Sequence, residues 1–98
     1  MGPVRALIVD ESSVMRKRIE PALRHAGIEQ LEAREAATGK DALTILGAAG
    51  FDLILSDIDM PSMDGLELLR QLRARKLASG VPVAMIATRP SQPLGPRA

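Results

Sequence analysis

The fold of this chain is decided by the stretch "FDLILSDIDMPSMDG", residues 51–65. An apolar run from Leu53 to Leu55 is followed by Asp57, Asp59 and Asp64 within eight positions. Clustered carboxylates repel one another and resist transfer out of water, so they need a cation, a proton or a reaction nearby. The stretch therefore predicts a buried strand with a functional site at its tip.

Composition limits what kind of protein this is. The chain has 98 residues, of which 46% are apolar, enough for one small domain with its own core. Phe51 is the only aromatic residue, and the net charge is +1, so we expect neither a nucleic-acid nor a membrane partner. The lack of cysteine excludes disulfides, thiolate catalysis and zinc–thiolate sites. No apolar run approaches the roughly 20 residues of a membrane span, so we expect a cytoplasmic location.

Apolar strand patterns alternate with amphipathic helix patterns along the chain. The predicted strands are Val4–Asp10, Leu31–Ala37, Phe51–Asp57 and Val81–Thr88, and the predicted helices cover 12–27, 38–50 and 64–76. This alternation predicts a parallel sheet with right-handed crossovers, an α/β fold of flavodoxin-like strand order 2-1-3-4. Residues 1–88 would form the domain, and 89–98, with three prolines, an irregular tail.

Each predicted helix has a face that we expect to point inward. In the first helix, apolar residues recur at helical spacing: Val14, Ile19, Ala22, Leu23 and Ala26. The expected inward residues are Ala42, Leu43 and Leu46 in the second helix, and the apolar face of the third carries Leu66, Leu69 and Leu72. In the flavodoxin-like order the first helix covers one face of the sheet and the next two cover the other. Pro21 lies inside the first helix and removes one backbone donor.

Polar side chains end three of the predicted strands. Asp10 and Glu11 end the first strand, Asp57 the third and Thr88 the fourth. Because ligands of open α/β sheets bind beyond the carboxyl ends of the strands, these groups are expected to converge at one crevice. Several carboxylates without His or Cys indicate a site for a hard cation such as Mg²⁺. A carboxylate in such a site could act as a nucleophile and form an acyl phosphate, and Thr88 could hydrogen-bond a phosphoryl oxygen.

Three segments, "LIVDESSVMRK", "FDLILSDIDMPSMDGLELLRQLR" and "VPVAMIAT", carry a family resemblance. The chain resembles a receiver domain of two-component signalling, and most closely the single-domain chemotaxis-type response regulators. The resemblance implies that Asp57 is the phosphoacceptor for a sensor histidine kinase and that Mg²⁺ is the cofactor. It also implies that Asp10 and Glu11 are the acidic metal pair, that the backbone carbonyl of Asp59 is a metal ligand, and that Thr88 is the switch hydroxyl. Such a protein accepts a phosphoryl group and is not an enzyme in the usual sense.

The chain departs from the family pattern at several points. Glu11 stands where Asp is commoner, and Asp59, two residues past the acceptor, stands where Asn is more usual, so Asp59 is a candidate for tuning dephosphorylation. The family continues with a further helix, a fifth strand and a last helix, so we expect a truncated receiver. No lysine follows Lys76, so the family's active-site lysine has no counterpart, and Arg89 is a weak substitute.

Two other readings of the sequence remain. The first is a degenerate receiver that serves as a phosphate-independent oligomerisation module. In that reading a homo-oligomer forms through the edge strand 81–88 and the uncovered face of the sheet, because unpaired strand edges invite pairing. The second is the D-x-D nucleophile motif of haloacid-dehalogenase-type phosphatases, matched by Asp57 and Asp59; the following "MPSMDG" fits the receiver loop better. The downstream target cannot be predicted from the sequence.

Overall fold

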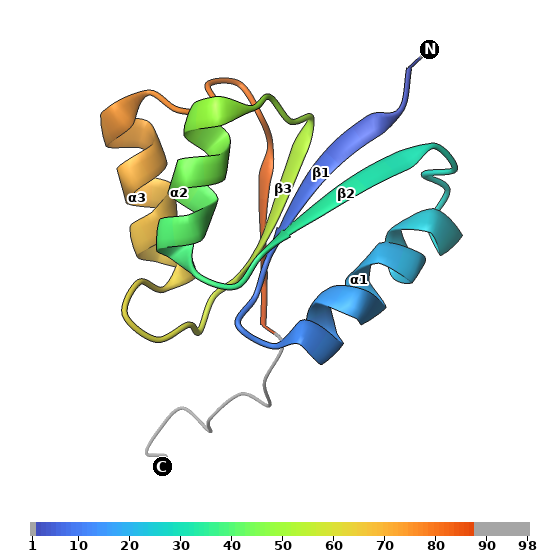
Figure 1. Cartoon of the computed structure of the whole chain (residues 1–98), viewed down its shortest axis with the longest axis horizontal. Helices are drawn as coiled ribbons and strands as arrows, with labels where there is room; N and C mark the ends of the chain where they lie inside the picture. Colours follow the sequence, from blue (N-terminus) through green and yellow to red (C-terminus); the bar gives the residue numbers. More distant parts are fainter. Residues whose placement is uncertain (1, 88–98) are drawn as a thin grey trace.

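The structure of the chain, a computed structural model, describes residues 2–87. Strands and helices alternate strictly in this part, as the sequence predicts (Figure 1). The elements are β1 (Val4–Val9), α1 (Ser13–His25), β2 (Leu31–Ala36), α2 (Gly39–Ala48), β3 (Leu53–Asp57), α3 (Gly65–Arg75) and β4 (Val83–Ile86). No helix among residues 2–87 has the length and apolar character needed to cross a lipid bilayer.

The four strands form one parallel sheet in the order β2-β1-β3-β4, which confirms the predicted flavodoxin-like topology. The strand β1 lies between β2 and β3, with Ala6 opposite Ala33 on one side and Leu53 on the other. The order reverses between β1 and β3, because the chain first adds β2 on one side of β1 and then β3 on the other. The carboxyl ends of these two central strands therefore flank the switch point of the sheet.

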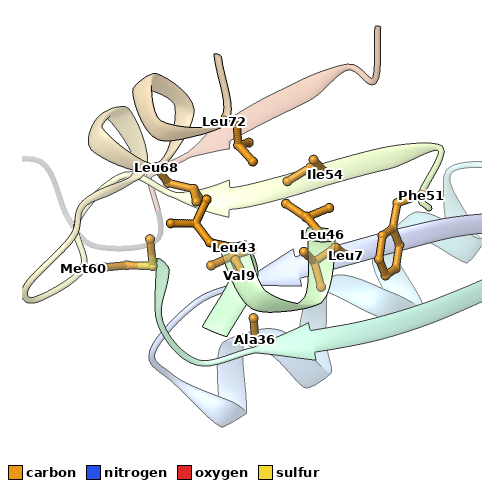
Figure 2. Close-up of a cluster of buried hydrophobic side chains, with 11 residues drawn as sticks. Leu7, Val9, Ala36, Leu43, Leu46, Phe51, Ile54, Met60, Leu68 and Leu72 are labelled. Carbon is orange, nitrogen blue, oxygen red and sulfur yellow. The ribbon is translucent and has the colours of Figure 1, made fainter. Parts of the chain in front are cut away.

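The larger part of the core lies between the sheet and the helices α2 and α3. The buried members of this cluster include Leu7, Val9, Ala36, Leu43, Leu46, Phe51, Ile54, Met60, Leu68 and Leu72, which Figure 2 shows packed together. Ala42, Leu43 and Leu46 point inward as predicted. Met60 comes from the loop after β3 and lies at the end of the cluster nearest the strand tips, so the core continues under that loop (Figure 2).

The opposite face of the sheet carries a smaller cluster and is covered by α1 (Figure 1). Ile19 and Leu23 of α1 pack against buried Leu55 and its neighbours, which confirms that α1, alone among the helices of residues 2–87, covers this face. Of the five apolar residues at helical spacing, Val14, Ala22 and Ala26 are exposed, and α1 has no fully buried residue. The inward stripe is narrow, with half-buried side chains at positions 15, 19 and 23, one every four residues.

Helix α3 is rotated relative to the sequence-based expectation. Leu68 and Leu72 are buried, Leu69 is half-buried, and Leu66 is 59% exposed, so the inward placement of Leu66 is wrong. The helix begins after Asp64, whose carboxylate accepts a hydrogen bond of 2.8 Å from the backbone N–H of Glu67. This confirms the predicted N-cap.

Strand β4 is shorter than predicted and lies at the edge of the sheet. It spans Val83–Ile86 rather than Val81–Thr88, and each of its residues is at least partly exposed. Pro82 precedes it and has no N–H to donate to a ladder, although its carbonyl accepts from the N–H of Ile54 at 3.0 Å. Thr88, Arg89 and the predicted tail 89–98 lie outside the described residues.

Candidate functional site

Two aspartates lie side by side at the carboxyl ends of the central strands. Val9 of β1 is in register with Ser56 of β3, so Asp10 and Asp57 are the next residues on neighbouring strands, which run about 5 Å apart. Both side chains are buried, with Asp10 1% and Asp57 2% exposed. The structure thus brings together the two carboxylates that the sequence places 47 positions apart.

Hydrogen bonds fix Asp10 on three sides. Its backbone N–H donates to the carbonyl oxygen of Ala36 at 3.0 Å, and its Oδ1 accepts from the backbone N–H of Ser12 at 2.8 Å. Its carbonyl oxygen accepts from Nη1 of Arg16 at 2.6 Å. The remaining polar atom, Oδ2, is buried and has no hydrogen-bond partner. Asp10 therefore presents one carboxylate oxygen in a fixed direction.

The two carboxylate oxygens of Asp57 also differ in their hydrogen bonding. Oδ1 accepts a hydrogen bond of 3.3 Å from the backbone N–H of Asp59, while Oδ2 is buried without a hydrogen-bond partner. A buried carboxylate oxygen left without a donor costs free energy. Asp10 and Asp57 both carry such an oxygen, and a cation bound between the two carboxylates would offset the negative charge of both.

The donor set fits a hard cation that keeps part of its water shell. Mg²⁺ takes oxygen ligands and usually retains several waters, so two carboxylates and a backbone carbonyl suffice on the protein side. Among residues 2–87, no group of three or more His, Cys, Asp or Glu side chains is placed so that the side chains alone could hold a metal ion. The side chains of Asp10, Glu11 and Asp57 thus do not form the predicted three-carboxylate metal site by themselves. The backbone carbonyl of Asp59 as a ligand stays a prediction.

Beside the two buried aspartates, a hollow of about 440 Å³ opens at the surface. Its walls are Glu11, Asp59, Met60, Pro61 and Asp64. Three of these five residues are acidic, so the hollow favours a cation or a cation-bound phosphoryl group over a bare anion. Glu11 and Asp59 were predicted to belong to the site. Asp64 was predicted only as the N-cap of the following helix, and in the structure it both caps that helix and lines the hollow.

Gly65 is a site residue that the sequence reasoning did not identify. Its N–H donates to the carbonyl oxygen of Ile58 at 2.8 Å, which closes the loop after β3 onto the start of α3. A Cβ at this position would collide with the carbonyl oxygen of Asp57 and would lie 2.9 Å from Sδ of Met85 and 3.1 Å from Cα of Ile58. The backbone of α3 can approach Asp57 this closely only because residue 65 has no side chain.

The switch role predicted for Thr88 falls outside the described residues and stays a prediction. The sequence contains no lysine after Lys76, and the expectation that the family's active-site lysine has no counterpart here also stays a prediction. Within residues 2–87, the predicted site residues that the structure places at one end of the sheet are Asp10, Glu11, Asp57 and Asp59.

Comparisons with known proteins agree with this geometry. The family described as "Response regulator receiver domain" matches residues 6–98. Chemotaxis protein CheY of Pseudomonas aeruginosa is 39% identical over 83 residues, covering 85% of this chain and 65% of the relative; CheY-3 of Vibrio cholerae is 37% identical, covering 85% and 62%. The chain therefore spans less than two thirds of the length of these relatives. The solved structure of Vibrio cholerae CheY4 superposes with a TM-score of 0.77 at 33% identity, covering 92% of this chain and 72% of that one.

Proposed function

This chain belongs to the response regulator receiver domain family of two-component signalling, and from that premise we propose that Asp57 accepts a phosphoryl group from a sensor histidine kinase. The observation that carries the proposal is the pair of buried carboxylate oxygens without hydrogen-bond partners, Oδ2 of Asp10 and Oδ2 of Asp57, at the switch point of the sheet. The proposal includes the chemotaxis-type role of the relatives and the cytoplasmic location expected from the sequence.

The two oxygens of Asp57 have different tasks in this proposal. Oδ1 is held by the backbone N–H of Asp59, so Oδ2 is the nucleophile. Oδ2 forms a bond to phosphorus while the bond from phosphorus to the donor's imidazole nitrogen breaks, and the electron pair of that bond stays on the imidazole. The product is an acyl phosphate on Asp57. The protein is thus a phosphoacceptor rather than an enzyme that turns over a separate substrate.

Mg²⁺ is the proposed cofactor, held by Asp10, Asp57 and the carbonyl of Asp59, with Glu11 at the rim of the hollow. When bound, it would neutralise the negative charge that gathers on the phosphoryl oxygens. Asp10 contributes a carboxylate oxygen held in a fixed direction, and the acidic residues that line the hollow attract the cation electrostatically. Thr88 is proposed as the switch hydroxyl that hydrogen-bonds the phosphoryl group.

Beryllofluoride, a phosphoryl mimic, tests whether the site binds a phosphoryl group and Mg²⁺ together, without requiring phosphoryl transfer. We expect it to raise the melting temperature of the wild type only when Mg²⁺ is present, because each ligand completes the site for the other. At a hundred times its dissociation constant a ligand stabilises by about 2.7 kcal/mol, which corresponds to about 10–20 °C in a domain of this size. The measurement is a thermal unfolding scan by circular dichroism, since the chain has no Trp or Tyr. An equal rise in Asp57→Asn would remove the assignment of Asp57.

Asp59 is proposed to set the lifetime of the acyl phosphate. Its side chain is exposed and lines the hollow next to Asp57, where it can orient an attacking water or repel it by charge. Asp59→Asn keeps the backbone N–H that holds Oδ1 of Asp57 and changes only the side chain. We expect the dephosphorylation rate to change by more than about threefold, a modest part of a general-base effect. Identical decay of the phosphorylated wild type and variant, followed by intact mass, would contradict this role.

A second candidate function, a phosphate-independent oligomerisation module, is favoured by the edge strand. Within residues 2–87, β4 is hydrogen-bonded only to β3, and its residues are at least partly exposed. Such an edge can pair with a second copy of the chain. We propose this homo-oligomer as the alternative to signalling through Asp57.

Sedimentation equilibrium distinguishes the two candidates. Ala84 is exposed on β4, so Ala84→Lys is expected to dissociate the oligomer without unfolding the domain, whereas Met85 packs beside Gly65 and is a poorer position to change. Asp57→Asn should remain oligomeric if assembly is independent of phosphate. A folded wild-type monomer at micromolar concentration would exclude the module.

A further inference from the structure

Arg16 lies in α1 and is bound at both ends of its guanidinium group. Nη1 donates to the carbonyl oxygen of Asp10 at 2.6 Å, and Nε donates to Oε1 of Glu35 at 2.7 Å. The side chain is only 14% exposed, although arginine is usually solvated. Because Glu35 belongs to β2 and Asp10 follows β1, this one side chain joins α1 to the site ends of two strands.

The bond to Asp10 fixes more than one atom. The carbonyl of Asp10 and the N–H of Glu11 share one rigid peptide plane, so holding the carbonyl sets the direction in which Glu11 leaves the strand. The other polar atoms of Asp10 are tied to Ala36 and Ser12, as described above, and only Oδ2 has no partner. Arg16 therefore supplies the contact that prevents this turn from rotating about the strand end.

Glu35 holds the guanidinium group in place. The hydrogen bond from Arg16, together with the charge of nearby Lys17, lowers the pKa of Glu35 below its usual value. Lys17 Nζ lies 3.5 Å from Oε2 of Glu35, so each carboxylate oxygen has its own cation. The carboxylate is 31% exposed and stays ionised at neutral pH, which keeps Nε of Arg16 engaged and Nη1 directed at Asp10.

We propose that Arg16, oriented by Glu35, is a positioning residue that aims Oδ2 of Asp10 and the backbone of Glu11 at a divalent cation of the Mg²⁺ class. This inference rests on the proposed function, since it assigns a role toward the same site. Groups that hold a ligand in place from behind commonly change metal affinity by tenfold or more when removed. Arg16 does so without touching the cation.

Arg24 provides a matched control on the same helix. It also donates to backbone carbonyls, those of Leu31 at 2.9 Å and Glu29 at 3.2 Å, and it also pairs with a glutamate, Glu20, at 3.0 Å. These contacts tie α1 to the start of β2, at the end of the sheet away from Asp10. The two arginines thus make the same kinds of contact at opposite ends of the sheet.

The test is the Mg²⁺ affinity of the unphosphorylated chain, measured by isothermal titration calorimetry on wild type, Arg16→Ala, Arg16→Lys and Arg24→Ala. We expect Arg16→Ala to weaken Mg²⁺ binding at least about tenfold. Arg16→Lys should recover only part of the loss, because an ammonium group cannot serve both acceptors with the fixed fork of a guanidinium. Arg24→Ala should bind Mg²⁺ within about twofold of the wild type, whatever its melting temperature.

A second pair of variants covers the case in which Arg16→Ala does not fold. Glu35→Gln keeps the shape of the side chain but releases Nε of Arg16, and we expect it to weaken Mg²⁺ binding about threefold. Glu32→Gln is its control on the same strand, because Glu32 is exposed and pairs with Arg5 at 3.7 Å, far from the site. We expect no change in affinity for Glu32→Gln.

The outcomes separate this inference from the proposed function. Unchanged Mg²⁺ affinity in both Arg16→Ala and Glu35→Gln, with normal binding by the wild type, would overturn the role of Arg16 and leave the proposed function standing. Equal losses in the Arg16 and Arg24 variants would also overturn it, since they would show only a loss of helix docking. A wild type that binds no Mg²⁺ would overturn the proposed function and this inference together.

Discussion

Asp57→Asn is expected to abolish phosphoryl uptake. With Mg²⁺ and a small phosphodonor such as acetyl phosphate, the wild type should gain one phosphoryl group by intact mass, and the variant none. The reason is that Oδ2 of Asp57 is buried, has no hydrogen-bond partner and lies at the switch point, where the neighbouring Asp10 carries a second such oxygen that can hold the cation. An amide in its place is not a nucleophile toward phosphorus.

The same variant should be more stable than the wild type when no divalent cation is present. Asn removes one of two adjacent buried charges and offers an N–H to Oδ2 of Asp10, which has no donor in the wild type. Satisfying one buried acceptor is worth about 1–3 kcal/mol, or roughly 5–20 °C in melting temperature here. Mg²⁺ should narrow the difference, because it stabilises only the wild type.

Asp52→Asn is the matched control for the loss of phosphoryl uptake and for the gain of stability expected in Asp57→Asn. Asp52 precedes β3 at the opposite end, where it is exposed and its Oδ2 accepts from the backbone N–H of Arg5 at 2.9 Å. We expect it to take up the phosphoryl group as the wild type does. Phosphorylation of Asp57→Asn at the wild-type rate, or loss of phosphorylation in Asp52→Asn, would contradict the assignment of the reactive group.

Gly65→Ala is expected to be among the most destabilising single changes in the chain. The added methyl group would overlap the carbonyl oxygen of Asp57 and would press on Cα of Ile58, both of which are backbone atoms that cannot swing away. Forcing extra volume into a packed site costs about 1–3 kcal/mol, so the melting temperature should fall by roughly 5–20 °C. The measurement is urea or thermal unfolding by circular dichroism.

Gly47→Ala separates this collision from the general effect of replacing a glycine. Gly47 is exposed in α2, and a Cβ there would meet nothing within 4 Å. Alanine is about 0.5–1 kcal/mol better than glycine in a helix interior, and in the last turn of α2, where Gly47 lies, this sets the upper bound of the gain, so the variant should be slightly more stable than the wild type. The two glycine variants are therefore expected to change the free energy of unfolding in opposite directions. A Gly65→Ala variant as stable as the wild type would show that α3 can move away from Asp57 at little cost.

Much of this architecture could be predicted from the sequence because a buried parallel strand requires a short continuous run of apolar residues, which is visible in the sequence itself. The apolar run before Asp57 and the one before Asp10 each marked a buried strand, and parallel strands place their carboxyl ends together. The convergence of these two aspartates followed from topology alone. The sequence could not predict that each carboxylate has one oxygen with a hydrogen bond and one without, because the donors are the backbone N–H groups of Ser12 and Asp59.

The rotation of α3 shows where periodicity was ambiguous. The run "GLELLRQL" offers two apolar stripes, one through Leu66 and Leu69 and one through Leu68 and Leu72. The structure selects the second, because Gly65 packs against the carbonyl of Asp57 and residues three, four and seven positions later share its face. Arg16 was missed for a different reason: neither its sequence neighbours nor its spacing reveals that Glu35, 19 positions away, would receive it.

The strand order also dictates when the site can come into existence. The central strands β1 and β3 are held together by contacts such as Arg5 with Asp52, 47 positions apart, so their pairing must close a long loop through α1, β2 and α2. Loop closure of this kind slows folding relative to local contacts, and during synthesis it must wait until β3 has left the ribosome. Before that moment, the first half of the chain holds Asp10 with no partner carboxylate beside it. The pocket of Asp10 and Asp57 and the middle of the sheet therefore form in one folding event, and neither half of the chain carries both carboxylates on its own.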